Sequence, residues 1–427
     1  MIKFILLIIR TFILLFVFTA YASGFNADNS SEQFEQIKIS LPPEEKIGTP
    51  EIISDYNSNE IAIKAVNKHI NLFTEKIREK FSLWLSRSGK YIELMKNILK
   101  KENIPEEIVF IPLIESGFSP NACSPARAVG YWQFIASTAR KYGLKINWWM
   151  DERRDPIKST VAAANYFKDL YKMFGSWNLA MAAYNAGEGK VLKALNMTKT
   201  EDYWSLLNTK YLRNETKDYV PKFIAASMIA NSPKEFGFDD IEYHPPFDYD
   251  EVTLDYPIDL DVAADCADTD LKTIKELNPE LTRWCTPPDV SEYTLRIPAG
   301  TKDIFLKNLS MIPEKERFSI EIYYIKKGDT LKKISRKTRI PLRVIIDLNS
   351  MEKLIPLKAG SAIFIPPKEK FVIDNFEKMY VKKASYKVKK KTIMKKRGSN
   401  KRIKNRGIKK VSIKYKMKNN RHSSQKT

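Results

Sequence analysis

One glutamate stands at the end of an unusually apolar segment. Residues 110–120 read FIPLIESGFSP, so Glu115 follows an aliphatic run and precedes Ser116 and Gly117, which end it. Apolar neighbours and the C-terminal end of a helix both disfavour a carboxylate, so both raise the pKa of Glu115. A carboxyl group protonated near neutral pH suits general acid catalysis, for example of glycosidic bond cleavage, where the leaving oxygen needs a proton. The alternative is a helix-end glutamate that turns to water.

The other polar and cysteine residues give weaker indications of catalytic chemistry. In DERRDP (residues 151–156) we interpret the three acids as partners of Arg153 and Arg154, with a structural role. The three His and three Cys show no metal-ligand spacing, so neither a metal site nor a cofactor is predicted. Cys266 and Cys285 could form a disulfide in an oxidising compartment, with Cys123 unpaired, or all three could be thiols, and the sequence leaves both alternatives open.

Helical patterning dominates residues 60–240. Apolar residues recur at three- and four-residue spacing, for example in AIKAVNKHINLFTEKI, which predicts one mainly helical domain. Pro105 is expected to begin one helix and Pro156 another, which Gly175 would end. These helices must position Glu115.

Two later segments repeat one order of elements. Residues 250–300 and 320–367 each read as a strand, two short helices and a strand that ends in Ile-Pro. This internal repeat predicts two small βααβ modules.

The two ends of the chain differ from its body. Residues 1–22 hold Lys3, an apolar stretch and an Ala-x-Ala site, which predicts a secretory signal peptide, with an uncleaved anchor as the alternative. Residues 23–59 are polar and are interpreted as a linker. Residues 371–427 hold 21 of the 72 Lys and Arg but only 2 of the 51 Asp and Glu, which predicts a disordered basic tail. We expect an exported protein in the periplasm or cell envelope, with association with a membrane as an alternative. Its tail would meet an anionic envelope surface or merely aid solubility, and nucleic acid is not an expected partner.

Five motifs in order carry a family resemblance. They are Glu115-Ser116, Ser124, Gly130 with Gln133, Ala183-Tyr184-Asn185 and Glu215-Thr216. In this order they resemble the soluble-lytic-transglycosylase (SLT) family of murein-degrading enzymes, and GYWQF with its preceding helices is most similar to the membrane-bound D group. The resemblance implies a mainly α, lysozyme-like catalytic domain over residues 60–240.

The second repeat resembles a LysM module. Its hallmarks are Gly328-Asp329-Thr330 and Asn349, which the resemblance implies as glycan-binding residues. The first repeat reads DYPIDLDV in place of the Gly-Asp-Thr turn, so it is interpreted as a degenerate LysM-like module. The expected fold class is therefore a lysozyme-like α domain, then small LysM-type modules and the disordered tail.

The resemblance also implies a reaction on peptidoglycan glycan strands. The MurNAc–GlcNAc bond would be cleaved with formation of a 1,6-anhydro sugar, with Glu115 as acid and then base, and with Tyr184 near the reacting centre. The substrate-binding or supporting residues would be Ser116, Ser124, Gln133, Asn185 and Glu215. Alternatively, Glu215 could be an N-terminal cap partner of the helix that begins at Lys217. Trp132, Trp148 and Trp149 could be core or sugar platforms. Two alternatives remain: a lysozyme-type hydrolase with Glu188 or Asp151 as second carboxylate, and a non-catalytic peptidoglycan-binding protein.

Overall fold

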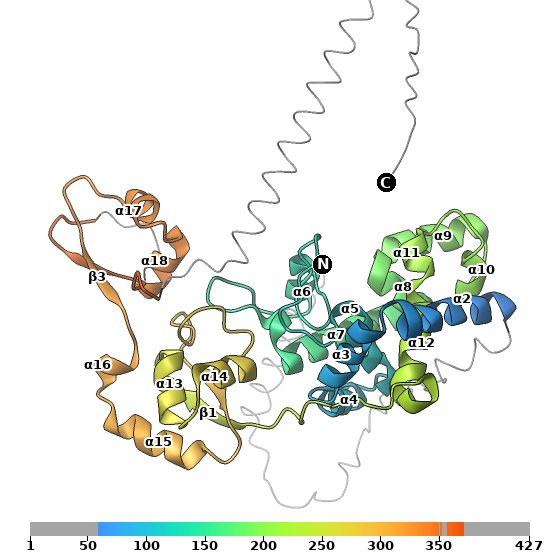
Figure 1. Cartoon of the computed structure of the whole chain (residues 1–427). Coiled ribbons are helices and arrows are strands. Elements are labelled where there is room, and N and C mark those ends of the chain that lie inside the picture. Colours follow the sequence, from blue (N-terminus) through green and yellow to red (C-terminus); the bar gives the residue numbers. More distant parts are fainter. Residues whose placement is uncertain (1–58, 350, 352–356, 371–427) are drawn as a thin grey trace, which may run out of the picture. The chain divides into compact units, whose positions relative to one another are not determined.

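The computed structural model describes residues 59–349, 351 and 357–370 (Figure 1). The signal peptide, the basic tail and all but the last residue of the linker, as predicted from sequence, lie outside the described residues. Within the described ranges, no helix combines the length and the apolar character that crossing a membrane requires.

Helices build the first domain, as the spacing of its apolar residues predicts. Its α-helices are α2 (Glu60–Asn71), α3 (Arg78–Ser88), α4 (Ile92–Lys101), α5 (Ile111–Ser116), α6 (Ala136–Lys141), α7 (Pro156–Phe174), α8 (Trp177–Ala186), α9 (Glu188–Thr198), α10 (Tyr203–Leu206), α11 (Asn214–Lys217) and α12 (Tyr219–Asn231). Short π or 3-10 segments are η2 (Leu72–Lys76), η3 (Glu106–Phe110), η4 (Glu152–Arg154) and η5 (Pro233–Phe236).

Local signals set the ends of α7 as predicted. Asp155 caps it by accepting the backbone N–H groups of Ile157 and Lys158 at 2.8 and 2.7 Å. Pro156 is its first residue, and Gly175 follows its last residue with a left-handed φ of 63°. The helix expected at Pro105 instead begins as the 3-10 segment η3 and continues as α5.

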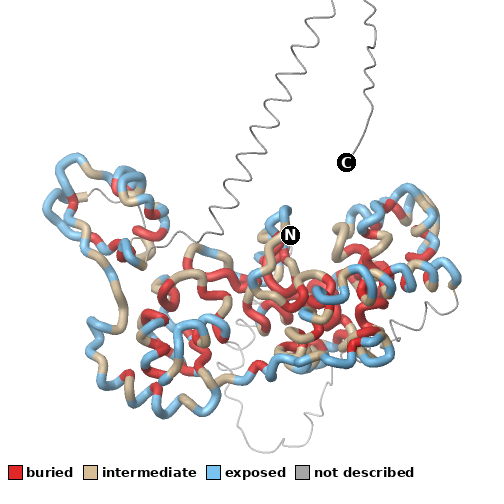
Figure 2. The backbone as a smooth tube through the Cα atoms, viewed as in Figure 1, coloured by how far each residue is buried: buried red, intermediate tan, exposed pale blue. Residues whose placement is uncertain are grey.

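The core of this domain lies between α5, α7, α8 and α12. Figure 2 shows buried residues along these helices, and the side chains of Trp132, Phe167 and Phe223 are fully buried. Helix α12 packs on α2, α5 and α8. The short helix that carries Glu115 therefore rests on the most buried part of the domain.

The two repeats have the predicted βααβ order. The first contains β1 (Asp250–Leu254), α13 (Leu260–Cys266), α14 (Leu271–Leu277) and β2 (Tyr293–Ile297), followed by α15 (Lys302–Met311) and α16 (Glu314–Arg317). The second contains β3 (Glu321–Tyr324), α17 (Leu331–Thr338), α18 (Leu342–Leu348) and β4 (Ala362–Ile365). Each repeat has one antiparallel strand pair, with Asp250 opposite Ile297 and Glu321 opposite Ile365. All three cysteines are free, so the alternative of a Cys266–Cys285 disulfide does not hold in this structure.

Buried contacts join the first repeat to the helical domain. Arg296 of β2 forms an ion pair with Asp155, with 2.5 Å between Nη2 and Oδ2. The backbone N–H of Asp151 donates to Glu280, and that of Thr282 donates to Trp149. Charged groups and backbone hydrogen bonds thus fix the two surfaces against each other.

Candidate active site

Glu115 lies at the C-terminal end of α5, where the chain turns sharply. Gly117 follows with a φ of 58°, and a Cβ at this position would lie 2.1 Å from the ring of Trp84. A left-handed residue without a side chain is therefore required directly after the Glu-Ser pair. The Ser116 hydroxyl donates to the carbonyl oxygens of Pro112 and Tyr131, at 3.1 and 2.8 Å. Ser116 thus anchors the helix end, and its hydroxyl proton is engaged by the backbone.

Helix α12 supplies two polar neighbours of Glu115. The Tyr219 hydroxyl donates a 2.7 Å hydrogen bond to Oε1 of Glu115. The Lys222 ammonium, one turn further along α12, donates to the carbonyl oxygen of Ile114 at 3.1 Å. Tyr219 therefore orients the carboxyl group, and Lys222 places a positive charge beside it.

The surroundings raise the pKa of Glu115 above its ordinary value. Burial is the largest cause, and the negative charge of Glu215 adds to it. The Tyr219 hydrogen bond and the Lys222 charge act in the opposite direction but do not outweigh burial. Burial and the Glu115 charge also raise the pKa of Tyr219 well above its ordinary range, so this phenol stays a neutral hydrogen-bond donor. The site therefore holds one carboxyl group whose protonated form is stabilised relative to that of a free glutamate.

Tyr184 is held beside Glu115 by α8. Its ring stacks on Phe167 with 4.7 Å between ring centroids, and its hydroxyl donates to the carbonyl oxygen of Trp132 at 2.6 Å. Burial and, after it, the charge of Glu115 raise the pKa of Tyr184 well above its ordinary range. The hydroxyl proton points to the backbone, so the oxygen is presented as an acceptor.

Asn185 and Glu215 meet at a small cavity of about 310 Å³. The Asn185 side-chain oxygen accepts from the Thr216 hydroxyl at 3.0 Å, which ties the end of α8 to α11. Glu215 is exposed, caps no helix in the described structure and influences Glu115 through its charge. The cavity is also lined by four cations: Lys190, Lys193, Lys210 and Arg213.

Ser124 and Gln133 shape the loop between α5 and α6. The Ser124 hydroxyl oxygen accepts the backbone N–H of Ala128, and the Gln133 amide donates to the carbonyl oxygens of Ala122 and Gly130 at 3.2 and 2.8 Å. Gln133 has a positive φ of 51°, which these hydrogen bonds stabilise. Both side chains brace the loop, and their predicted contact with substrate stays a prediction.

The predicted glycan-binding residues of the second repeat also hold its turns. Gly328 has a φ of 80°, the Asp329 carboxylate accepts from the Tyr323 hydroxyl and the Lys326 N–H, and Thr330 caps α17. Asn349 joins α18 to β4 through hydrogen bonds to Ile345 and Phe364.

Two of the tryptophans, Trp132 and Trp149, and the DERRDP segment have structural roles. Trp132 is buried and donates to the Thr160 hydroxyl, and Trp149 is buried as well, so both belong to the core. Arg283 lies over the ring of Trp148, with 4.1 Å from Cζ to the centroid. The predicted acid–arginine pairing is right for Asp151 with Arg153 but wrong for the other acids, because Glu152 pairs with Lys158 and Asp155 with Arg296.

Sequence reasoning missed Tyr219 and Lys222. Both lie in YVPKFIAASMIAN, a helix whose other residues are almost all apolar. A lysine three residues after a tyrosine on such a helix places two polar groups on one face. These two polar groups on an otherwise apolar helix are the sequence feature that could have identified Tyr219 and Lys222 as site residues. Among the described residues, no cluster of three or more His, Cys, Asp or Glu side chains could hold a metal ion.

Three family matches cover the described domains. The chain matches the Transglycosylase SLT domain over residues 93–207, the LysM-like domain of lytic transglycosylase MltD over residues 248–314, and the LysM domain over residues 323–366. The second match extends beyond β2, in agreement with the packing of α15 on α13 and β1.

Curated relatives and solved structures bear related names. The chain is 33% identical over 295 residues to membrane-bound lytic murein transglycosylase D of Escherichia coli K12, covering 65% of this chain and 64% of that protein. It is 24% identical over 161 residues to membrane-bound lytic murein transglycosylase C of Serratia proteamaculans, covering 32% of this chain and 45% of that protein. The 70 kDa soluble lytic transglycosylase Slt70 of E. coli matches with 23% identity and a TM-score of 0.31, covering 43% of this chain and 30% of that one.

The chain spans slightly less than two thirds of the length of the first of these relatives. The order of its domains is the order expected from the sequence motifs, and the helical domain holds the Glu-Ser pair that the resemblance singles out. The chain therefore carries a transglycosylase SLT domain, followed by a LysM-like domain of the kind matched in lytic transglycosylase MltD and by a LysM domain.

Proposed function

We propose that the protein is a lytic murein transglycosylase that cleaves the MurNAc–GlcNAc β-1,4 bond of peptidoglycan and leaves a 1,6-anhydro sugar. The observation that carries this proposal is the single Glu115 carboxyl, whose pKa burial raises and whose Oε1 accepts from Tyr219. The family match and the names of the relatives support the same reaction class.

The first step uses the protonated form of Glu115. Because Tyr219 donates to Oε1, the carboxyl proton sits on Oε2. From there it passes to the glycosidic oxygen as the bond to C1 of the muramoyl residue breaks, and positive charge develops on that ring. The Tyr184 hydroxyl oxygen, whose proton is donated to Trp132, presents its lone pairs to that charge.

The second step reverses the proton transfer. Glu115, now a carboxylate stabilised by Tyr219 and by the Lys222 charge, accepts the proton of the muramoyl 6-hydroxyl as its oxygen bonds to C1. No water is consumed, and the substrate supplies the nucleophile. A single carboxyl group is therefore sufficient.

A lysozyme-type hydrolase would need a second carboxylate about 5–9.5 Å from the first. Asp151 does not suit this role, because it is buried and Arg153 donates to both of its oxygens. Of the two carboxylates named from the sequence, Glu188, whose Oε2 lies 3.4 Å from the Tyr166 hydroxyl, therefore remains a candidate. The products distinguish the two reactions.

The test is mass spectrometry of fragments released from purified murein by the full chain. We expect fragments one water lighter than reducing-end sugars, at least a hundredfold less of them with Glu115→Gln, and an intermediate loss with Tyr219→Phe. Reducing-end fragments would indicate hydrolysis and would direct attention to Glu188→Gln.

A folded wild type that binds murein but releases no fragments would refute both enzymatic reactions. It would favour the non-catalytic binding protein instead.

The proposal also covers location and further contacts. We place the protein outside the cytoplasm in the cell envelope, where its substrate lies; the curated relatives are named membrane-bound. The LysM domain at residues 323–366 would bind the glycan, and the basic tail would meet an anionic envelope surface. Loss of salt-sensitive envelope sedimentation on deletion of residues 371–427 is the test of the tail.

A further inference from the structure

A second, larger cavity lies between the helical domain and the LysM-like domain. It measures about 980 Å³, at the upper end of the range for ligand pockets, roughly 300–1,000 Å³. Neither Glu115 nor Tyr184 lines it. The loop from Phe118 to Asn121 does, and this loop begins three residues after Glu115. The cavity is therefore separate from the active site but adjacent to it along the chain.

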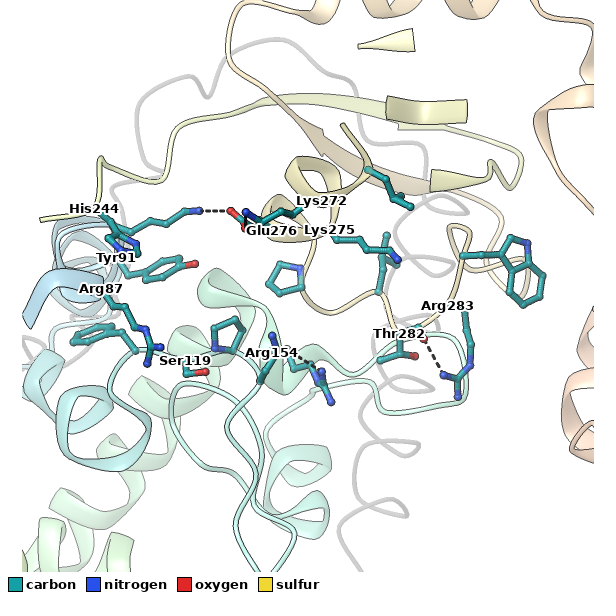
Figure 3. A pocket seen from close by; sticks show the side chains of 18 of the residues that line it. Arg87, Tyr91, Ser119, Arg154, His244, Lys272, Lys275, Glu276, Thr282 and Arg283 are labelled. Carbon is teal, nitrogen blue, oxygen red and sulfur yellow. Dashed lines mark hydrogen bonds and ion pairs between the residues drawn. The ribbon is translucent and has the colours of Figure 1, made fainter. Parts of the chain in front are cut away.

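Cations dominate the lining. Figure 3 shows Arg87 and Arg154 from the helical domain on one side, and Lys272, Lys275 and Arg283 from the LysM-like domain on the other. Lys90 also lines the cavity. The one lining carboxylate is Glu276, which lies 3.7 Å from both Lys90 and Lys272. With Lys370, which also lines the cavity, seven cations surround one carboxylate and leave a strong positive excess in this cavity.

Two of these cations are available to a ligand. Among the described residues, neither the Arg87 guanidinium nor the Lys275 ammonium has an ion-pair or hydrogen-bond partner. Arg87 is partly buried and Lys275 is exposed. Apolar groups, including Tyr91, Phe118 and Trp284, complete the wall. The lining thus combines positive charge with an apolar surface against which the aliphatic parts of a peptide can pack.

Buried contacts hold the two walls together. The ion pair between Arg296 and Asp155 and the hydrogen bonds of Thr282 to Trp148 and Trp149 cross the same boundary. The cations from the two domains therefore face one preformed space and need no rearrangement to meet a common ligand.

We propose that this cavity binds the acidic peptide attached to the muramoyl residues of the substrate; this rests on the proposed function. Such a stem peptide carries several carboxylates and, where it contains a diamino acid, one free amine. Several anionic groups match the excess of guanidinium and ammonium groups, and the amine matches Glu276. A ligand with phosphates but no amine fits less well, because nothing in it would pair with Glu276. The cavity would select peptide-bearing over peptide-free strands.

The test is calorimetric titration of the full chain with the free tripeptide L-Ala–γ-D-Glu–meso-diaminopimelate. We expect binding that weakens with salt, at least about tenfold weaker binding of the same peptide with its carboxylates amidated, and a similar loss in Arg87→Gln/Lys275→Gln. The control is Lys64→Gln/Lys307→Gln, which removes two positive charges from exposed positions outside the cavity and should bind as the wild type does.

Cleavage of peptide-free glycan separates this inference from the proposed function. The cavity variant should cleave peptide-free strands at the wild-type rate and lose only its preference for peptide-bearing ones. Cleavage without peptide binding, or equal binding of the native and amidated peptides, would overturn the inference and leave the proposed function intact. Binding of vesicles containing anionic phospholipid, lost in the cavity variant, would also overturn it in favour of a lipid head group.

Discussion

Replacement of Arg296 by methionine should destabilise the protein strongly. The exposed fractions of the side chains of Arg296, Asp155 and Glu280 are 7%, 0% and 2%. Arg296 contacts Asp155 at 2.5 Å and Glu280 at 3.5 Å, so its removal leaves two buried carboxylates without their cation. Loss of one partner of a buried ion pair costs about 3–5 kcal/mol. We therefore expect the free energy of unfolding to fall by that amount.

The assay is urea unfolding followed by circular dichroism and tryptophan fluorescence. The matched control is Lys272→Met, because Lys272 pairs with Glu276 one helical turn away and the two side chains are 83% and 52% exposed. An exposed pair of this kind contributes roughly 0.3–0.5 kcal/mol. In Arg296→Met the loss of stability should shrink as the pH falls and protonates Glu280, because burial and the Asp155 charge already raise the pKa of Glu280. A loss below about 1 kcal/mol, or equal losses in the two variants, would refute the reasoning.

Two further predictions concern Glu115 and the loop before α6. Because burial raises the folded-state pKa of Glu115, the stability of the wild type should fall as the pH rises from the unfolded-state pKa, about 4.3, through the folded-state pKa. At pH 8 the free energy of unfolding of Glu115→Gln should therefore exceed that of the wild type by about 1.4 kcal/mol for each unit by which folding raises the pKa. A difference that persists unchanged at pH 3.5 would contradict this. Gly130→Ala should lower the stability of the fold more than Gly143→Ala does. Both residues have a positive φ, at 83° and 88°, but only at Gly130 would the added Cβ meet a backbone oxygen, that of Arg153 at 1.8 Å. The left-handed backbone alone costs an alanine roughly 1–2 kcal/mol at either position. Equal melting temperatures of the two variants would therefore show that the clash with Arg153 is relieved.

Local signals explain what the sequence could predict. Pro156, Gly175 and the cap at Asp155 act within a few residues of one another, so the ends of α7 follow from the sequence around them. The same holds for Glu115, whose apolar neighbours precede it directly. The repeated order of strands and helices likewise predicts both βααβ modules, because each module closes its own strand pair.

Contacts between distant residues explain what the sequence could not predict. Tyr219 lies 104 residues from Glu115, and Arg296 lies 141 residues from Asp155. Spacing along the chain carries no information about such pairs, because packing of the helices and modules brings them together. Ser124, Gln133 and Asn349 could be named from motifs, whereas their hydrogen bonds to nearby backbone required the structure.

The first repeat shows why a module can lose its hallmark turn and keep its fold. The side chain of Asn278 holds Ile274 and Arg296, much as Asn349 holds Ile345 and Phe364 in the second repeat. This clamp between helix and strand is therefore kept in both modules. Arg296 beside it turns to the helical domain, and the Tyr293 hydroxyl donates to the buried Glu280. Because these buried contacts with the helical domain stabilise the first repeat, its fold does not depend on the Gly-Asp-Thr turn that the second repeat retains.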